Sequence, residues 1–274
     1  RPEVIERLEM LANVTPADLL LETLDRRGPM PARALIADGG LPSEAAAETL
    51  NQLLQEEQVF LLSPELAQAE AGFKSLASSP QYVASPAGWA ILRSRVTGEV
   101  AEFHRAQPLR QGIPREALKS RLKLETRLFN EAVARLASQG ALIDDKNVVR
   151  LPEHEVRFSP GQQEAIDRLL HDFRRAPYTT PSYKDSVAAV GEDVVLALVE
   201  GGRLVRLGPD VLLLQETYDE LMAWVKTYIF EHDSVNVAQV RDAFDTSRKY
   251  ALALLEYLDD QRVTKRVGDE RILR

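Results

Sequence analysis

The side chains best suited to chemistry in this 274-residue sequence gather near its C-terminus. Two hydroxyls, two cations and one aromatic ring follow one another at Thr246, Ser247, Arg248, Lys249 and Tyr250. Hydroxyl and cationic groups bind phosphate oxygens, and an aromatic ring can stack on an unpaired base. A helix that begins here adds free backbone N–H groups and a positive dipole end, which favour anions. The pattern therefore favours contact with a nucleic acid, and the residues alone do not distinguish DNA from RNA.

Further cations precede this stretch and lie in a predicted β-hairpin after it: Arg241, Arg262, Lys265, Arg266 and Arg271. Gly268 and Asp269 form a two-residue turn signal between two short strand-like runs. That turn places Arg266 directly opposite Arg271, and like charges across a hairpin are unfavourable. We therefore expect a polyanion between these two arginines.

The elements that must position these residues are three helices and the hairpin. Apolar residues at helical spacing predict helices over 216–232, 237–244 and 245–261, with Asp245 or Thr246 as the N-cap of the third. The buried stripe of the third helix is expected at Ala251, Leu254, Leu255 and Leu258. Three helices followed by a hairpin are typical of the winged-helix form of the helix-turn-helix, whose third helix presents its first residues to the ligand.

The same order of predicted elements recurs along the chain with a period of roughly 60 to 75 residues. The fold class that follows is mainly α with small β-hairpins, or α+β, built as four tandem winged-helix modules. Their predicted bounds are 1–80, 81–151, 152–214 and 215–274. Short linkers that contain prolines predict an extended array.

Charge is distributed unevenly over a chain with a net charge of −8. Residues 1–80 carry −7, whereas residues 81–157 carry +4. An acidic body with local basic patches argues against non-specific binding of polyanions over the whole surface. The bases of the second module are Arg110, Arg115, Lys119, Arg121, Lys123 and Arg127. They suit either contact with ribosomal RNA or docking on the acidic first module, with docking slightly favoured.

Chemistry of other kinds finds little support. The absence of cysteine excludes disulfides, cysteine-ligated zinc and thiol nucleophiles. No phosphate-binding glycine-rich loop occurs, and His104, His154, His171 and His232 have no partner at metal-ligand spacing. We therefore expect no catalytic residues, no metal and no cofactor.

No apolar run is long enough to span a membrane, so a cytoplasmic protein is expected. A chain that opens with Arg1 is expected to be part of a longer protein.

Two stretches carry a resemblance to a known family. FDTSRKYALALLEYLDDQRVTKRVGDERILR, at 244–274, resembles the C-terminus of SelB, the bacterial selenocysteine-specific translation elongation factor. FHRAQPLRQGIPREALKSRL, from Phe103 to Leu122, is similar to a second recurring block of that family. Together they cover under a quarter of the chain. The resemblance implies winged helices, the last of which binds the selenocysteine insertion hairpin (SECIS) in mRNA beside a UGA codon.

The resemblance also implies partners and contact residues. The ribosome is an implied partner, whereas GTP and selenocysteinyl-tRNA would bind to domains that this sequence lacks. Carried over by position, the RNA-contact candidates are Arg241, the stretch from Ser247 to Tyr250, and the hairpin cations Arg262, Lys265, Arg266 and Arg271. A monomer is expected. In this hypothesis the last module binds the RNA hairpin, and the other modules hold the GTPase part at a set distance from it. This raises the effective concentration of selenocysteinyl-tRNA at the ribosomal site.

Two other classes of protein share these features. A DNA-binding winged-helix regulator usually reads two half-sites as a dimer, which suits four unlike and mostly acidic modules poorly. A protein-interaction scaffold of winged helices predicts no salt-sensitive binding of RNA. Competition between an RNA hairpin and duplex DNA, followed over a range of salt concentrations, separates the three hypotheses.

Overall fold

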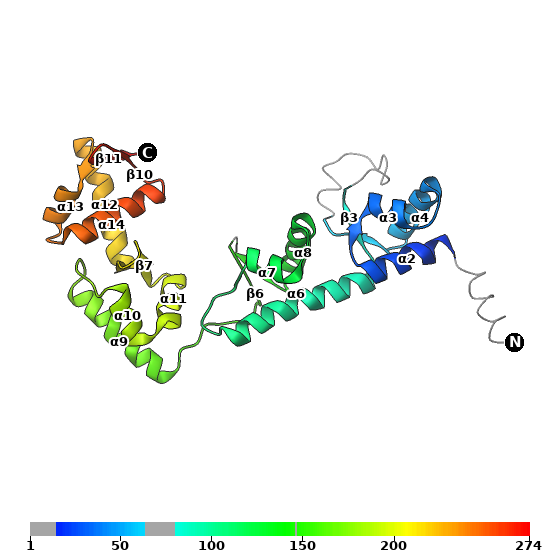
Figure 1. Cartoon of the computed structure of the whole chain (residues 1–274), viewed down its shortest axis with the longest axis horizontal. Helices are drawn as coiled ribbons and strands as arrows, with labels where there is room; N and C mark the ends of the chain where they lie inside the picture. Colours follow the sequence, from blue (N-terminus) through cyan, green and yellow to red (C-terminus); the bar gives the residue numbers. More distant parts are fainter. Residues whose placement is uncertain (1–14, 64–79, 146) are drawn as a thin grey trace. The chain divides into compact units, whose positions relative to one another are not determined.

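The computed structural model describes residues 15–63, 80–145 and 147–274 (Figure 1). The described chain is mainly helical with small antiparallel sheets, as predicted. It divides into two compact units, one holding the residues up to 106 together with 112–154, and the other holding 107–111 together with 155–274.

The first unit contains two groups of elements in the same order: a helix, a short strand, two helices and a pair of strands. The first group consists of α2 (Pro16–Arg27), β1 (Met30–Pro31), α3 (Ala32–Asp38), α4 (Ser43–Gln55), β2 (Phe60–Leu61) and β3 (Tyr82–Ala84). The second consists of α6 (Pro86–Ala106), β4 (Ile113–Pro114), α7 (Arg115–Leu122), α8 (Thr126–Ser138), β5 (Ile143–Asp145) and β6 (Val148–Arg150). In each group the short strand joins the pair as a third antiparallel strand, in the orders β1-β3-β2 and β4-β6-β5. The predicted wing between β2 and β3 lies mostly outside the described residues.

The second unit contains a third and a fourth group. The third consists of α9 (Pro160–Arg175), α10 (Tyr183–Val190), α11 (Glu192–Glu200), β7 (Leu204–Arg206) and β8 (Leu212–Leu214). The fourth consists of α12 (Gln215–His232), β9 (Val235–Asn236), α13 (Val237–Ala243), α14 (Arg248–Asp260), β10 (Thr264–Val267) and β11 (Glu270–Leu273). The strands pair as β7-β8 and as β10-β11-β9. Among the residues that the structure describes, three helices followed by a strand pair therefore occur four times, and only the third group lacks the short strand after its first helix.

Local sequence signals explain where several helices begin. Thr15, Ser159, Ser182 and Asn236 each accept a hydrogen bond from a backbone N–H three residues later. The side chain of that later residue in turn accepts from the backbone N–H of the cap. These capping boxes satisfy N–H groups that lack partners within the helix, and they fix the starts of α2, α9, α10 and α13.

The first group has an apolar core of its own, and its strands also pack into the core of the second group. Tyr82 of the first group is buried in the same cluster as Phe129 of the second. The hydroxyl of Tyr82 donates to the carboxylate of Glu125 at 2.7 Å. The guanidinium of Arg135 lies 4.2 Å from the ring centre of Phe60, across the same boundary. The first and second groups therefore stabilise each other, as expected for domains too small to bury much surface alone.

Arg135 is the exception among the basic side chains of the second group, because the bases that the sequence singled out there form no ion pair with the described residues of the first group. Four of them pair with acids of their own group: Arg115 with Asp144, Lys119 with Glu116, Arg121 with Glu99, and Arg127 with Glu131. Arg110 pairs instead with Glu200 at 2.6 Å, within the second unit. The sequence favoured ion pairs between these bases and the acidic first module. Among the described residues no such pair is found.

The third group likewise has an apolar core of its own and also packs into the core of the fourth. Val205 and Leu213 of the third group lie in one cluster with Val225 and Leu255 of the fourth. The segment 107–111 joins this unit, because both the backbone N–H and the side chain of Gln111 donate to Glu200, at 3.1 and 2.9 Å. The fourth group is thus held by the third through buried contacts.

A buried histidine gives the first unit a testable dependence on pH. His104 lies in the last turn of α6 at only 7% exposure, and its Nε2 accepts a hydrogen bond from the Leu151 N–H at 3.2 Å. Burial, together with electrostatic interactions with His154 and Arg150, lowers the pKa of His104 from 6.5 to about 4. The ring is therefore neutral in the folded protein, as its acceptor role requires.

We predict that the first unit loses stability as the pH falls from 7 towards 4. Over this window the unfolded chain binds a proton at His104 that the folded chain does not, so folding becomes less favourable by about 2 kcal/mol. Urea unfolding at several pH values measures the loss, and NMR titration gives the pKa of His104 directly. His171, which is exposed, serves as the control ring. A titration of His104 near 6.5 would contradict the prediction.

Candidate nucleic-acid interface

The predicted hairpin is confirmed. β10 and β11 are joined by Gly268 and Asp269, and Gly268 has a φ of +64°, a conformation that glycine adopts without strain. The register places Arg266 opposite Arg271, as expected. The stripe of Ala251, Leu254, Leu255 and Leu258 on α14 is buried, also as expected.

The start of the recognition helix differs from the prediction. The N-cap of α14 is Ser247, not Asp245 or Thr246. Asp245 has a φ of +46°, and the N–H of Thr246 donates to the carbonyl of Arg241, so the chain is still turning at these residues. The Ser247 side chain makes no capping bond and is exposed, so its hydroxyl remains available to a ligand.

Three of the predicted contact residues face the third group. The hydroxyl of Thr246 donates to the carbonyl of Tyr178, and that of Tyr250 donates to the carbonyl of Thr180. Lys249 forms an ion pair with Asp210. This pair raises the pKa of Lys249 and lowers the pKa of Asp210. Thr246 and Tyr250 therefore hold the first turn of α14 against the third group, and Lys249 is exposed but already paired.

Arg271 requires a correction. Its side chain is 2% exposed, and its Nε donates to the carboxylate of Asp259 at 3.2 Å. The same carboxylate accepts from the hydroxyl of Thr264 at 2.7 Å. The charge of Arg271 is therefore met by an acid of α14, so the polyanion expected between Arg266 and Arg271 is not needed to explain their pairing. We remove Arg271 from the candidate contact set.

The remaining candidates are exposed. Arg248, Arg262 and Lys265 form no ion pair with any residue that the structure describes. Arg266 pairs weakly with Asp269 at 3.7 Å, and Arg241 pairs with its neighbour Asp242 at 2.7 Å. One further cation beside the hairpin is Arg274, which the sequence analysis did not include; it is exposed, and its N–H donates to the carbonyl of Val263. Its position at the end of the second hairpin strand was the available signal.

The basic side chains gather at the two ends of α14, not along its length. Arg248 begins the helix and Arg262 follows its end, whereas the exposed positions between them include Glu256 and Asp260. A polyanion can therefore contact the start of the helix and the wing. It would meet like charge if it followed the whole helix.

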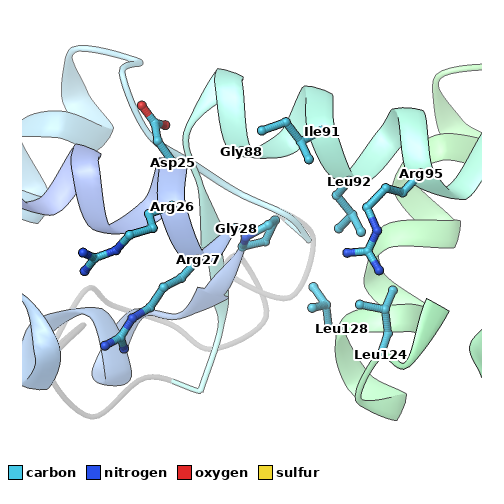
Figure 2. A pocket seen from close by; sticks show the side chains of 11 residues that line it. Asp25, Arg26, Arg27, Gly28, Gly88, Ile91, Leu92, Arg95, Leu124 and Leu128 are labelled. Atoms are coloured by element: carbon cyan, nitrogen blue, oxygen red, sulfur yellow. The ribbon is translucent and has the colours of Figure 1, made fainter.

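A hollow of about 180 Å³ in the first unit is less suited to a charged ligand. It lies between the end of α2, α6 and the start of α8 (Figure 2). Figure 2 shows Arg95 reaching towards Leu124 and Leu128, while Arg26 and Arg27 point away from them. Arg95 already donates to the carbonyl of Leu122, and Arg27 pairs with Asp38. The polar groups of this hollow are thus largely used within the protein.

The described residues offer neither a metal-binding cluster nor a helix that could span a membrane. Residues 15–63, 80–145 and 147–274 contain no cluster of three or more histidine, aspartate or glutamate side chains that could hold a metal ion. Every helix within these ranges is too short or too polar to cross a membrane.

Comparison with known proteins identifies two segments. The family described as "Elongation factor SelB, winged helix" matches residues 227–273, and a second model of the same description matches residues 98–151. Both segments are thus similar to SelB winged helices. The first covers the end of α12 and all of β9, α13, α14, β10 and β11. The second covers the end of α6 and the rest of the second group.

Two relatives that match larger parts of the chain are selenocysteine-specific elongation factors. The chain is homologous to the selenocysteine-specific elongation factor of Desulfomicrobium baculatum, with 27% identity over 183 residues, which is 64% of the chain and 29% of that protein. It is 24% identical over 239 residues to that of Haemophilus influenzae, covering 83% of the chain and 38% of that protein. The chain thus spans about a third of the length of these SelB relatives.

Two solved structures are also similar. One is a bacterial selenocysteine-specific elongation factor, with a TM-score of 0.39, 17% identity, and coverage of 71% of this chain and 31% of that one. The other is the mRNA-binding domain of SelB from E. coli in complex with SECIS RNA, with a TM-score of 0.34, 23% identity, and coverage of 43% of this chain and 99% of that one.

Proposed function

We propose that this chain is the mRNA-binding part of a selenocysteine-specific elongation factor, and that its last winged helix binds the SECIS hairpin. The observation that carries the proposal is the SelB winged-helix match at 227–273, on a group whose free cations lie at the helix start and on the wing. The contact set that we propose is Arg241, Ser247, Arg248, Arg262, Lys265, Arg266 and Arg274. Lys249 can join this set only if its ion pair with Asp210 breaks.

The remaining groups have a supporting role in this proposal. We infer that all four groups are winged-helix modules, with bounds near 1–80, 81–151, 152–214 and 215–274, because they repeat one order of elements. The chain would act by binding, without catalysis and without a cofactor of its own. GTP, selenocysteinyl-tRNA and the ribosome are proposed partners of the complete factor. Holding the message beside the factor raises the effective concentration of the tRNA at the UGA codon.

RNA fits this surface better than duplex DNA does. A recognition helix in the major groove passes close to phosphates on both sides. The exposed Glu256 and Asp260 would be repelled by those phosphates, whereas a hairpin loop can bend away from them. The splayed bases of a loop also offer edges that a paired helix hides.

The test is competition at fixed salt. The full chain is first bound to a labelled mRNA hairpin taken from the sequence beside a selenocysteine UGA codon. We expect unlabelled hairpin to displace the labelled one. A fully paired RNA of equal length and duplex DNA should compete at least about 100-fold less well, because specific and non-specific binding differ by several kcal/mol. Fluorescence anisotropy gives the affinities. If duplex DNA competes as well as the hairpin, the proposal fails.

A further inference from the structure

Three aromatic rings form a stacked column along α12. The ring centres of Trp224 and Tyr228 lie 4.8 Å apart with planes inclined by 26°. Those of Tyr228 and His232 lie 4.2 Å apart at 11°. A spacing of four residues places all three on one face of the helix. Because Tyr228 is in the middle, its two faces are both covered, and His232 forms one end of the column.

The end of the column is held in a fixed orientation and is open. The Nδ1 of His232 lies 3.1 Å from the carbonyl oxygen of Tyr228. Because a carbonyl oxygen can only accept, this contact is a hydrogen bond in the tautomer that carries the proton on Nδ1. In the neutral ring Nε2 is then a free acceptor. His232 is exposed, and among the described residues no ring covers its outer face. Stacking and hydrogen bonding thus order this side chain before any ligand arrives.

The column ends beside the wing. His232 is the last residue of α12, and Ser234, two residues later, donates to the carboxylate of Glu270 on β11 at 2.7 Å. The strand that follows, β9, pairs with β11. A nucleic acid held by the wing cations would therefore lie near the end of α12 that carries His232.

The charges around His232 indicate which part of a nucleotide fits there. Glu231 and Asp233 flank it in the chain, both exposed, and Glu270 is held nearby through Ser234. These carboxylates repel a phosphate. A nucleobase is uncharged, stacks on any aromatic face, and can donate an exocyclic amino hydrogen to the free Nε2.

We propose that His232 is a base-stacking residue, on which an unpaired nucleobase of the bound RNA continues the Trp224–Tyr228–His232 column as a fourth ring. The inference rests on the proposed function, because it requires that the wing holds an RNA with an unpaired base. It adds a contact on α12 to those on α14 and the wing. The site would select for RNA that has a free base at the right distance from the phosphates bound by the wing.

The experiment couples the protein ring to one RNA base. Each unpaired position of the hairpin is made abasic in turn, and affinities are measured for the full chain and for His232→Ala, His232→Phe and His171→Ala. In the wild type, one abasic position should weaken binding about tenfold, the loss typical of one stacked base. In His232→Ala the affinity for the intact hairpin should fall by a similar factor, and that abasic position should cost nothing further.

The other variants separate stacking from general damage. His232→Phe keeps the ring and should bind the intact hairpin within about threefold of the wild type. His171→Ala removes an exposed histidine elsewhere in the unit and should behave as the wild type. If the hairpin binds, but His232→Ala has the same affinity and abasic profile as the wild type, the stacking inference is wrong and the proposed function stands. If duplex DNA displaces the hairpin from the wild type, the proposed function itself fails.

Discussion

Replacing Arg248, Arg262 and Lys265 together by alanine should weaken binding of the mRNA hairpin by roughly 100-fold near physiological salt. These three cations are exposed, and none is paired with an acid that the structure describes, so their charge is available to phosphates. Each phosphate contact that is lost also means fewer released counterions. The slope of log affinity against log salt should therefore fall by about two to three units.

The control must change the net charge equally. Lys226 on α12, and Arg168 and Arg175 on α9, are also exposed and lie in the same unit. Their triple alanine variant loses the same three charges away from the helix start and the wing. We expect it to bind within about threefold of the wild type. An equal loss of affinity in both variants would mean that binding depends only on the net charge of the protein. No loss of affinity in either variant would place the RNA site elsewhere.

The sequence was most informative where the signal is local. The turn at Gly268 and Asp269 needs a backbone conformation that few residues adopt, so the hairpin and its register followed from two residues. The buried stripe of α14 followed from helical spacing. The capping residue of α14 did not, because Thr246 is held by the carbonyl of Tyr178, a contact across 68 residues that no local pattern reveals.

The alternation of polar and apolar residues along β11 does not predict which face of the wing is buried. Arg271 and Ile272 are neighbours on β11, and the usual pattern would bury the isoleucine and expose the arginine. The structure does the reverse, with Arg271 2% exposed and Ile272 37% exposed. The cause is Asp259 at the end of α14, which supplies a partner for a buried guanidinium. The contact set is correspondingly smaller than the cation count suggests, because Lys249 and Arg271 are both engaged by acids of the protein.

This arrangement predicts a large effect on stability. Replacing Asp259 by alanine should lower the free energy of unfolding of the second unit by about 3 kcal/mol. The change leaves the Arg271 guanidinium buried without its counter-charge, and one of its nitrogens, Nη2, already has no partner among the described residues. It also removes the acceptor of the Thr264 hydroxyl, which is buried at 1% exposure. Asp260, the exposed neighbour, supplies the matched control, and its alanine variant should change stability by no more than about 0.5 kcal/mol.

Urea unfolding followed by the fluorescence of Trp224, in a Trp89→Phe background, reports on this unit without signal from the other. A second variant distinguishes a structural Arg271 from an RNA ligand. Removing both charges, with Asp259→Leu and Arg271→Met, should recover much of the stability lost by Asp259→Ala, because no buried charge is then left unpaired. The double variant should also keep its affinity for the hairpin within about threefold, since Arg271 is not at the surface. A stable double variant with hairpin binding reduced tenfold or more would instead return Arg271 to the RNA contact set, and it would show that the wing opens its Asp259 pair when RNA binds.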